Sequence, residues 1–414
     1  MPDLYSLILY CSLFVSLFFE VFLLITYLEA REEIEKEVGF EGEALNFPSV
    51  TVIVPCFNEE HTVEKTIGSL FALDYPNDKL SFVLVDDGST DGTLDTLRKF
   101  EDNSRIRILS KANGGKHTAI NLALEKIDSE LVGCLDADSF VMSDALQRIV
   151  RHFGDESVMA VTPSIKVHEP SNFLELMQSI EYRWGIFLRR MLSSLGALYI
   201  TPGPFSIFRT RVFKELGGYR EAHLTEDLEM ALRLQKNRYK IVNSHNAQVY
   251  TVAPKNLGAL VKQRVRWTYG FINNALDYRE LFFNKRYGQV GIFILPIALF
   301  SIFSSLFIIS NVLLNFFDKI FDVIARYKVA GFNWEFSFPS FDWYFVNTGI
   351  LPLLTISTVS LTFIILYLSI ALSDGKFKFS RGILYYVALY AFFVPLWLSR
   401  ALFDTVFRRR VSWR

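Results

Sequence analysis

Residues 49–60 read SVTVIVPCFNEE, a run of β-branched and apolar residues that ends in polar and acidic ones. A short, uninterrupted apolar run of this kind is typical of a strand buried on both faces of a parallel sheet. A helical pattern follows at His61–Phe71, where Val63, Ile67 and Leu70 share one face. The sequence therefore predicts a buried strand that leads through a polar loop into a helix.

The same alternation of strand and helix continues to residue 135. Further strands are predicted at Ser81–Val85, Ile106–Leu109 and Leu131–Leu135, and helices at Thr93–Phe100 and Thr118–Ile127. This alternation implies right-handed crossovers and an α/β, Rossmann-like domain with a mostly parallel sheet. Because ligands of such sheets bind beyond the carboxyl ends of the strands, the residues that follow each strand are the candidate site.

Acidic residues follow two of these strand ends. Asp86 and Asp87 lie in VDDGSTDG, and Asp136 and Asp138 lie in DADS. An acidic turn that caps the next helix would explain either pair. Two carboxylates at the end of a buried strand are costly unless a nucleobase amide, a ribose hydroxyl or a cation uses them. Asp136 and Asp138 share one side of an extended segment, where they could bind Mg²⁺ or Mn²⁺ together with substrate phosphates.

Other nucleotide-binding patterns do not occur in the sequence. No G-x-G-x-x-G follows the first strand, which disfavours a dinucleotide-binding Rossmann site, and Gly114-Gly115-Lys116 lacks the spacing of a Walker A loop. These glycines could still let the backbone and the Lys116 amine approach a phosphate. The net charge of −1 predicts no nucleic-acid partner, and the three cysteines show no metal-ligand spacing.

The triplet Thr225-Glu226-Asp227 opens a helical run at Leu228–Gln235. These residue types are ordinary at the start of a helix, because a hydroxyl and acids are favoured there. The alternative is a catalytic base, which needs a carboxylate held close to the attacking hydroxyl. Repulsion between Glu226 and Asp227 would raise the proton affinity of the pair. The local sequence leaves both interpretations open.

The segment QRVRW (263–267) lies shortly before the second long apolar stretch of the chain. Gln263, Arg266 and Trp267 fall at i, i+3 and i+4, so one helical face presents an amide, a guanidinium and an indole, while Arg264 points elsewhere. Trp and Arg at a membrane boundary are often only anchors. The alternative is that the arginine binds a diphosphate and the indole a sugar ring.

Four stretches are apolar and long enough to span a bilayer. They are Leu4–Leu28, Val290–Phe317, Val346–Leu372 and Gly382–Ser399. The first lacks the basic start and the cleavage site of a signal peptide, so we interpret it as a retained anchor. Its Glu20 is either functional or tolerated against another helix.

Basic residues near the spans predict the orientation of the chain. Arg31, Lys36 and the basic connector Ser373–Arg381 place residues 30–285 in the cytoplasm. Four arginines among the last seven residues also prefer the inside, although three spans after the domain would export them. Either the tail is exported despite its charge, or one C-terminal segment is re-entrant, or Phe317–Ala330 lies along the interface as an amphipathic helix.

Together these motifs resemble those of processive family 2 glycosyltransferases, the cellulose, chitin, hyaluronan and poly-N-acetylglucosamine synthases. Over residues 48–285, seven motifs occur in the order of that family: VPCFNEE, VDDGSTDG, KANGGKHTAIN, DADS, GPFSIF, TED and QRVRW. The resemblance implies a GT-A fold and an inverting, metal-dependent enzyme. Such an enzyme transfers a sugar from a UDP-sugar, with its catalytic domain on the cytoplasmic side of the plasma membrane.

The resemblance also implies roles for the residues at matching positions. Asp227, with Glu226 beside it, matches the general base; Asp136 and Asp138 match the diphosphate–metal motif, Asp138 as the direct ligand. The positions that hold the donor nucleotide are Phe57, Glu59, Asp86, Asp87, Lys116 and Asp136. The positions that hold the diphosphate and the acceptor are Gln263, Arg264, Arg266, Trp267, Gly203 and Thr225.

The expected product is a β-linked polysaccharide of GlcNAc, because KQRVRW and Thr225–Gln235 look closest to poly-β-1,6-N-acetylglucosamine synthases. The single N-terminal span departs from that group and keeps a chitin-like oligosaccharide or a glucan open. Transfer of one sugar to a lipid-linked acceptor is the alternative reaction, and a membrane scaffold with an inactive transferase domain is the alternative class. Four spans give little material for a polymer channel, so a small membrane subunit or self-association could complete it.

The expected organisation is a GT-A domain between membrane segments. Its predicted units are an N-terminal anchor (1–29), a linker (30–47), the GT-A domain (48–254), an amphipathic or interfacial helix with QRVRW (255–287) and a C-terminal membrane region (288–414). The expected partners are a UDP-sugar, a glycan or lipid-linked acceptor, and membrane lipids.

Overall fold

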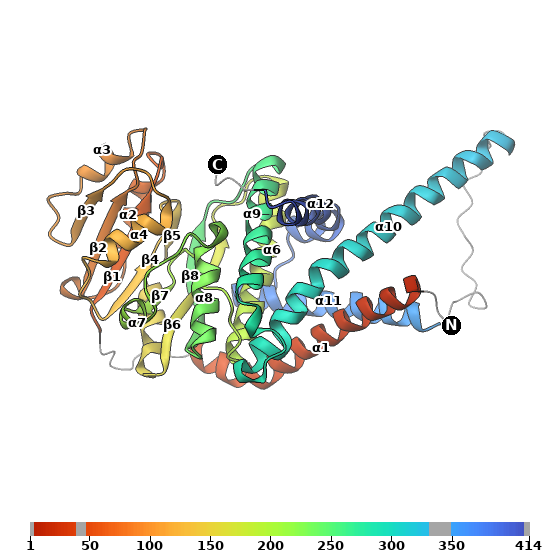
Figure 1. The fold of residues 1–414 in the computed structure, drawn as a ribbon, viewed down its shortest axis with the longest axis horizontal. Coiled ribbons are helices and arrows are strands. Elements are labelled where there is room, and N and C mark those ends of the chain that lie inside the picture. The colour runs from red at the N-terminus through yellow and green to blue at the C-terminus, as the bar shows by residue number, and fades with distance from the viewer. Residues whose placement is uncertain (1–3, 39–46, 331–348, 410–414) are drawn as a thin grey trace.

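The computed structural model describes residues 4–38, 47–330 and 349–409. A sheet lies at one end of the molecule, and long helices extend from it to the other end (Figure 1). The expected α/β fold with a helical region is thereby confirmed. Part of the predicted linker (39–46), the start of the third predicted span (346–348) and the end of the arginine-rich tail (410–414) lie outside the described residues.

The strands form an eight-stranded sheet in the order β3-β2-β1-β4-β7-β6-β8-β5. Its members are β1 (Val50–Cys56), β2 (Leu80–Asp86), β3 (Ile106–Ser110), β4 (Leu131–Cys134), β5 (Ser139–Val141), β6 (Val158–Val167), β7 (Ile207–Arg209) and β8 (Lys240–Thr251). The four predicted strands are β1 to β4, and their neighbours pair in parallel. Beyond them, β7 runs antiparallel to both β4 and β6. The sheet is therefore parallel through its first half and mixed beyond it.

One group of helices lies around the sheet, and a second group of longer helices forms the rest of the molecule (Figure 1). Those that accompany the sheet are α2 (Val63–Phe71), α3 (Thr93–Arg98), α4 (Lys116–Leu124), α5 (Ala145–Val150), α7 (Arg211–Leu216) and α8 (Glu226–Lys236). The longer ones are α1 (Leu4–Val38), α6 (Phe173–Ser194), α9 (Leu257–Asp277), α10 (Leu295–Ala330), α11 (Ile350–Asp374) and α12 (Arg381–Val406). Two 3₁₀ turns follow α9, so the helix predicted over 255–287 ends ten residues earlier, at Asp277.

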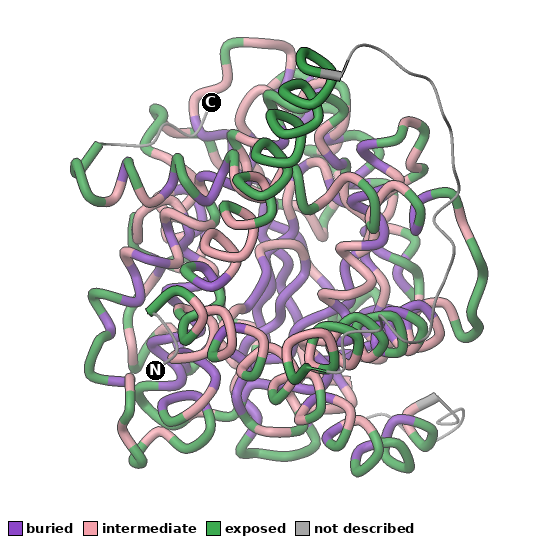
Figure 2. The backbone as a smooth tube through the Cα atoms, turned by 90° about the vertical axis from the view of Figure 1, so that its right-hand side faces the viewer, coloured by how far each residue is buried: buried purple, intermediate pink, exposed green. Residues whose placement is uncertain are grey.

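The parallel half of the sheet is buried on both faces because side chains alternate along each strand. In β1, Val52 and Val54 pack in a cluster with residues of α2 and α5. Ile53 points to the opposite face and packs in a cluster with residues of α4 and α8. Figure 2 shows this buried core in purple at the centre of the molecule. The uninterrupted apolar sequence of residues 49–56 follows from burial on both sides.

Four helices in the described part of the chain are long and apolar enough to cross a membrane. They are α1, α10 with the π-helical turn Val290–Ile294 before it, α11 and α12, which correspond to the four predicted spans. Helix α10 continues through residues 317–330, so this segment prolongs a span and is not a separate helix. Glu20 of α1 accepts a 2.6 Å hydrogen bond from Thr362 of α11, which favours the interpretation that this acid is tolerated against another helix.

Helix α1 extends beyond the predicted anchor and into the predicted linker. Ala30 and Ile34 are buried in a cluster with Phe187 of α6. Farther along, Glu37 Oε1 lies 3.0 Å from Nη2 of the buried Arg190. Residues 30–38 therefore continue α1 and pack against α6.

Helices α6 and α9 lie between the sheet and the long apolar helices (Figure 1). Val265 of α9 shares a cluster with Trp397 of α12. Gly382 of α12 approaches α6 so closely that a Cβ at this position would lie 2.6 Å from the Leu176 carbonyl oxygen. The segment that contains QRVRW thus packs, through Val265, on a helix that is long and apolar enough to cross a membrane.

Candidate active site

The loops after β1 and β2 lie side by side at the carboxyl edge of the sheet. Asn58 adopts a left-handed backbone conformation (φ 56°), and its Oδ1 accepts a hydrogen bond from Thr90 N (2.8 Å). Glu59 N donates to Thr93 Oγ1 (2.8 Å). These bonds join the loop that carries Phe57 to VDDGSTDG, so the first two motifs predicted to hold the nucleotide are neighbours.

The two carboxylates at the end of β2 are buried, with Asp86 2% and Asp87 3% exposed. Asp86 accepts hydrogen bonds from Ser89 N and Ser110 Oγ, each at 3.1 Å. These bonds offset part of the cost of burying the charge. A carboxylate has about four acceptor positions, so Asp86 can accept a further bond from a ligand.

Asp87 holds the glycine loop in place. Its oxygens accept hydrogen bonds from the amides of Gly114 (3.1 Å) and Gly115 (2.8 Å). Lys111 Nζ lies 2.6 Å from the same carboxylate, an ion pair that the sequence analysis did not find. Asp87 therefore fixes the backbone immediately before Lys116.

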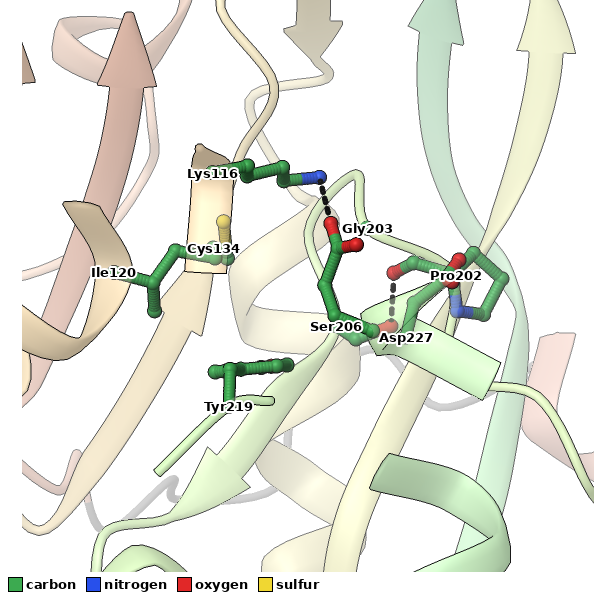
Figure 3. A pocket seen from close by; sticks show the side chains of 9 residues that line it. Lys116, Ile120, Cys134, Pro202, Gly203, Ser206, Tyr219 and Asp227 are labelled. Atoms are coloured by element: carbon green, nitrogen blue, oxygen red, sulfur yellow. Dashed lines mark hydrogen bonds and ion pairs between the residues drawn. The ribbon is translucent and has the colours of Figure 1, made fainter. Parts of the chain in front are cut away.

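Lys116 begins α4 and brings together acids from two other elements. Its Nζ lies 2.6 Å from Asp136 Oδ1 and 3.5 Å from Glu226 Oε1. Burial alone would lower the pKa of Lys116, but the two carboxylates raise it well above its ordinary value. Gly203 lies against this group, where a Cβ would come within 2.7 Å of Nζ. Figure 3 shows Lys116, Gly203 and Asp227 around a cavity of about 10 Å³.

Asp138 is partly buried and repelled by other acids. Burial raises its pKa to about 7, and the charges of Asp136 and Glu59 add to the shift. Carboxylates that repel each other fit a hard divalent cation, which typically takes one or two of them together with substrate phosphate oxygens. Among the described residues, no group of three or more His, Cys, Asp or Glu side chains could hold a metal without such a substrate.

Asp227 is the second residue of α8, near the positive end of the helix dipole. Thr201 Oγ1 donates a 2.7 Å hydrogen bond to its carbonyl oxygen. Burial, with repulsion by Glu226, raises the pKa of Asp227 to about 6, while Lys116 and Arg266 oppose the shift. The repulsion expected from the sequence is present, and burial is the larger cause. A carboxyl group with this pKa is suited to accept a proton near neutral pH.

Helix α9 arranges the QRVRW side chains differently from the prediction. Arg264 is predicted to point away from Trp267, but its guanidinium carbon lies 4.2 Å from the centre of the Trp267 ring. Arg264 Nη1 also donates to Gln263 Oε1 (2.8 Å). Residues three apart are neighbours on a helix, and this spacing relates Arg264 to Trp267 as it relates Gln263 to Arg266. The cluster around the indole is therefore Gln263, Arg264 and Trp267.

Arg266 turns from this cluster toward α8. Its Nη1 donates to the carbonyl oxygen of Leu224 (3.1 Å), three residues before Asp227. Trp267 is 36% exposed, so one part of the indole remains accessible. Helix α9 thus presents the partly exposed indole of Trp267 in one direction and the Arg266 guanidinium, which acts on Asp227 of α8, in another.

One residue of this arrangement was missed in the sequence. Glu181 of α6 accepts hydrogen bonds from Arg264 Nη2 (2.8 Å) and from Tyr390 OH of α12 (3.1 Å), so it joins three helices. The capping box formed by Asn172 and Glu175 marks the start of α6 and could have located that helix. Nothing in the local sequence pairs Glu181 with Arg264.

Three comparisons relate the chain to known proteins. A family model described as glycosyltransferase like family 2 matches residues 48–270. A poly-beta-1,6-N-acetyl-D-glucosamine synthase of Staphylococcus epidermidis is 27% identical over 269 residues, which cover 64% of this chain and 65% of that protein. A synthase of the same name from Staphylococcus aureus is 28% identical over 296 residues, or 70% of each chain. The match with the first relative thus spans slightly less than two thirds of its length.

A solved structure has a similar fold. It is a mannosyltransferase from Pyrobaculum calidifontis in complex with GDP-Man and Mn²⁺, with a TM-score of 0.58 and 18% sequence identity. The alignment covers 96% of this chain and 99% of that one, so it includes the long helices as well as the sheet. At this identity the likeness concerns the fold, and it agrees with a GT-A domain.

Proposed function

Because this chain belongs to glycosyltransferase family 2, we propose that it transfers GlcNAc from UDP-GlcNAc, with inversion, to the growing end of a β-linked extracellular polysaccharide. The chain is a glycosyltransferase and a membrane protein, and its relatives are named as poly-β-1,6-N-acetylglucosamine synthases. The observation that carries the proposal is the position of α9, which places Arg266 beside the acid of α8 and leaves Trp267 partly exposed.

In the proposed reaction, Asp227 takes the proton of the acceptor hydroxyl while that oxygen attacks C1 of the donor sugar. The new bond joins C1 to the acceptor oxygen, the bond from C1 to the diphosphate breaks, and its electron pair leaves with UDP. Lys116 and Arg266 carry positive charge close to Asp227, where they stabilise the charge that develops on the diphosphate. Repeated addition requires that the lengthened acceptor stays bound, and the indole of Trp267 provides a flat surface for its sugar ring.

Donor binding is assigned to the carboxyl edge of the sheet. Phe57 and Glu59 lie in the loop after β1, and Asp86 ends β2 beside it; a nucleoside would bind where the two loops are joined. Asp87 acts by holding the glycine loop. Gly203 leaves room beside Lys116, which a side chain would fill.

Asp136 and Asp138 fit a divalent cation, Mg²⁺ or Mn²⁺, that binds together with the donor. When bound, such a cation neutralises charge on the diphosphate. The mannosyltransferase of similar fold was solved with Mn²⁺, which supports a divalent metal. In this arrangement Lys116 keeps one oxygen of Asp136 oriented through its ion pair.

We further infer that the sheet part faces the cytoplasm, at the plasma membrane. The support is the distribution of basic residues, with Arg31 and Lys36 after the first span and Lys376 and Lys378 before the last. The product would leave on the other side. A small membrane subunit or a second copy of the chain is proposed to complete the path.

The test uses the purified full chain with Mg²⁺ or Mn²⁺ and a panel of UDP-sugars, followed by mass spectrometry. The proposal expects a ladder of products from UDP-GlcNAc and no product when EDTA removes the metal. A single sugar on a lipid fraction would favour the alternative of one transfer to a lipid-linked acceptor. Polymer formed from another UDP-sugar would indicate a different β-glycan. The absence of UDP release from every donor would favour a membrane scaffold with an inactive transferase domain.

A further inference from the structure

The backbone immediately before α8 adopts an unusual conformation. Ala222, His223 and Leu224 all have positive φ angles, of 44°, 54° and 66°. Residues other than glycine rarely enter this left-handed region, and three in succession are strained. We call these three residues the left-handed turn. A strained segment persists only where its surroundings hold it in place.

Asn274 of α9 contacts both the first residue of the left-handed turn and the residue that follows the turn. It is 1% exposed, and its Nδ2 donates hydrogen bonds to Ala222 O (3.0 Å) and to Thr225 Oγ1 (2.9 Å). Thr225 is the N-cap residue of α8, which continues with Glu226 and Asp227. One carboxamide thus bridges the start of the left-handed turn and the start of the helix that carries the proposed base. No motif or spacing in the sequence singles out Asn274.

Three further residues on the same face of α9 support this contact. Arg266 Nη1 donates to Leu224 O (3.1 Å), and Asp277 Oδ2 lies 2.9 Å from His223 Nε2. Between them, Gly270 packs directly on the Thr225 side chain, with no space for a Cβ. With Asn274, these positions are spaced by four, four and three residues, which places them along one side of a helix.

We propose that Asn274 is a positioning residue for sugar transfer: it holds the left-handed turn against α9 and thereby sets the place of the Asp227 carboxylate. The inference rests on the proposed function, in which Asp227 is the base. Asn274 lies on α9 and binds the turn, so it acts on the reaction only through α8. A misplacement of about 1 Å at the base is enough to cost a large factor in rate.

The test compares two neighbouring asparagines in the full-length protein. In the Asn274→Ala variant, the kcat of sugar transfer should fall about 10- to 100-fold, while the Kd of UDP and the KM of UDP-sugar stay within about twofold of wild type, because the donor site is untouched. Asn273→Ala is the matched control. Its side chain binds Tyr269 O (2.8 Å) and Thr405 Oγ1 (3.3 Å) instead of the turn, and its kcat should stay close to that of wild type.

Rescue by glycine separates positioning from general damage. Glycine adopts positive φ freely, so Ala222→Gly added to Asn274→Ala should restore several-fold of the lost kcat. A kcat of Asn274→Ala equal to that of wild type would overturn the inference. A parallel loss of UDP binding without rescue by Ala222→Gly would also overturn it, because a general folding defect would then explain the result. An inactive wild-type chain would instead reject the proposed function itself.

Discussion

The donor side of the site, formed by the loops after β1 and β2, is held differently from the acceptor side, formed by α8, α9 and the left-handed turn. On the donor side, the buried carboxylates accept hydrogen bonds from nearby backbone amides and from the Ser110 hydroxyl. On the acceptor side, Arg264 Nε and Asn274 Oδ1 are buried without a hydrogen-bond partner among the described residues. The donor side is thus held by bonds within its own loops, whereas the acceptor side is held by contacts between helices that are distant in sequence.

The largest effect is expected where the acceptor side carries the chemistry. Asp227→Asn should lower sugar transfer by about 10²- to 10⁴-fold, the range of general-base contributions. The Kd of UDP should change by less than about threefold, because the donor side does not include this residue. Transfer assays and UDP titrations on the same preparation measure both. Full polymerisation by the variant would contradict the assignment of the proton transfer to the acceptor side.

A donor-side variant should show the opposite pattern. Asp87→Asn places an amide group where the carboxylate accepts from two backbone amides and Lys111. Losing charge-assisted bonds costs about 1.5–3 kcal/mol, so the KM of the UDP-sugar should rise about 10- to 100-fold, more than kcat falls. Asp95→Asn, whose side chain is 84% exposed, is the control and should behave as wild type. A fall in kcat alone would contradict this division.

A smaller effect is expected from the contact between α6 and α9. Glu181→Gln removes the charge that pairs with Arg264, which lies over Trp267. We expect shorter products and a fall of about tenfold in the rate of chain extension, equivalent to about 1.4 kcal/mol, while UDP release at the first transfer changes less. Gel or mass analysis of product length measures this difference. Glu156→Gln, at a side chain that is 80% exposed, is the control; equal product lengths in both variants would refute the role of Glu181.

The smallest effect is the dependence of the rate on pH. Asp227 acts as a base only when ionised, and burial with repulsion by Glu226 raises its pKa to about 6. The ionised fraction therefore falls as the pH drops through 6, and kcat at pH 6 should be about half of its value at pH 8. The profile should be recorded at saturating metal and donor. A rate that stays constant down to pH 5 would show that another group takes the proton.

The sequence predicted the donor side better than the acceptor side. Each donor motif follows its own strand, so the uninterrupted apolar run of β2 locates Asp86 and Asp87 without knowledge of the rest of the fold. The four membrane spans were found for a similar reason, because length and apolar composition are local properties. Strands β5 to β8 were not predicted, since they pair out of sequence order and depend on the completed sheet.

The acceptor side could not be derived from local patterns. Helical spacing alone grouped Gln263 with Arg266 and Trp267, but both Gln263 and Arg264 are within helical reach of the indole. The Arg264 side chain is bound by Glu181, which lies 83 residues earlier in the sequence, and helical spacing cannot predict this contact. The left-handed turn was missed because it contains no glycine, and Ala222 and Leu224 rarely adopt positive φ. Hydrogen bonds from α9 hold these residues in their conformation, and the spacing of residues within 220–230 does not indicate those bonds.

The length of α10 has a consequence for the bilayer around the enzyme. Its 36 residues would extend about 54 Å at 1.5 Å per residue, against a hydrocarbon thickness of about 30 Å. An upright α10 would therefore project several turns into water or among lipid headgroups, although Phe317, Phe321 and Ile324 are exposed along that end. Asp318, Lys319 and Asp322 alternate with these apolar side chains, so the segment fits a place at the headgroups, where its apolar side chains can meet lipid. The excess length of α10 thus brings its last turns to the membrane surface, while its packing against neighbouring helices sets its tilt.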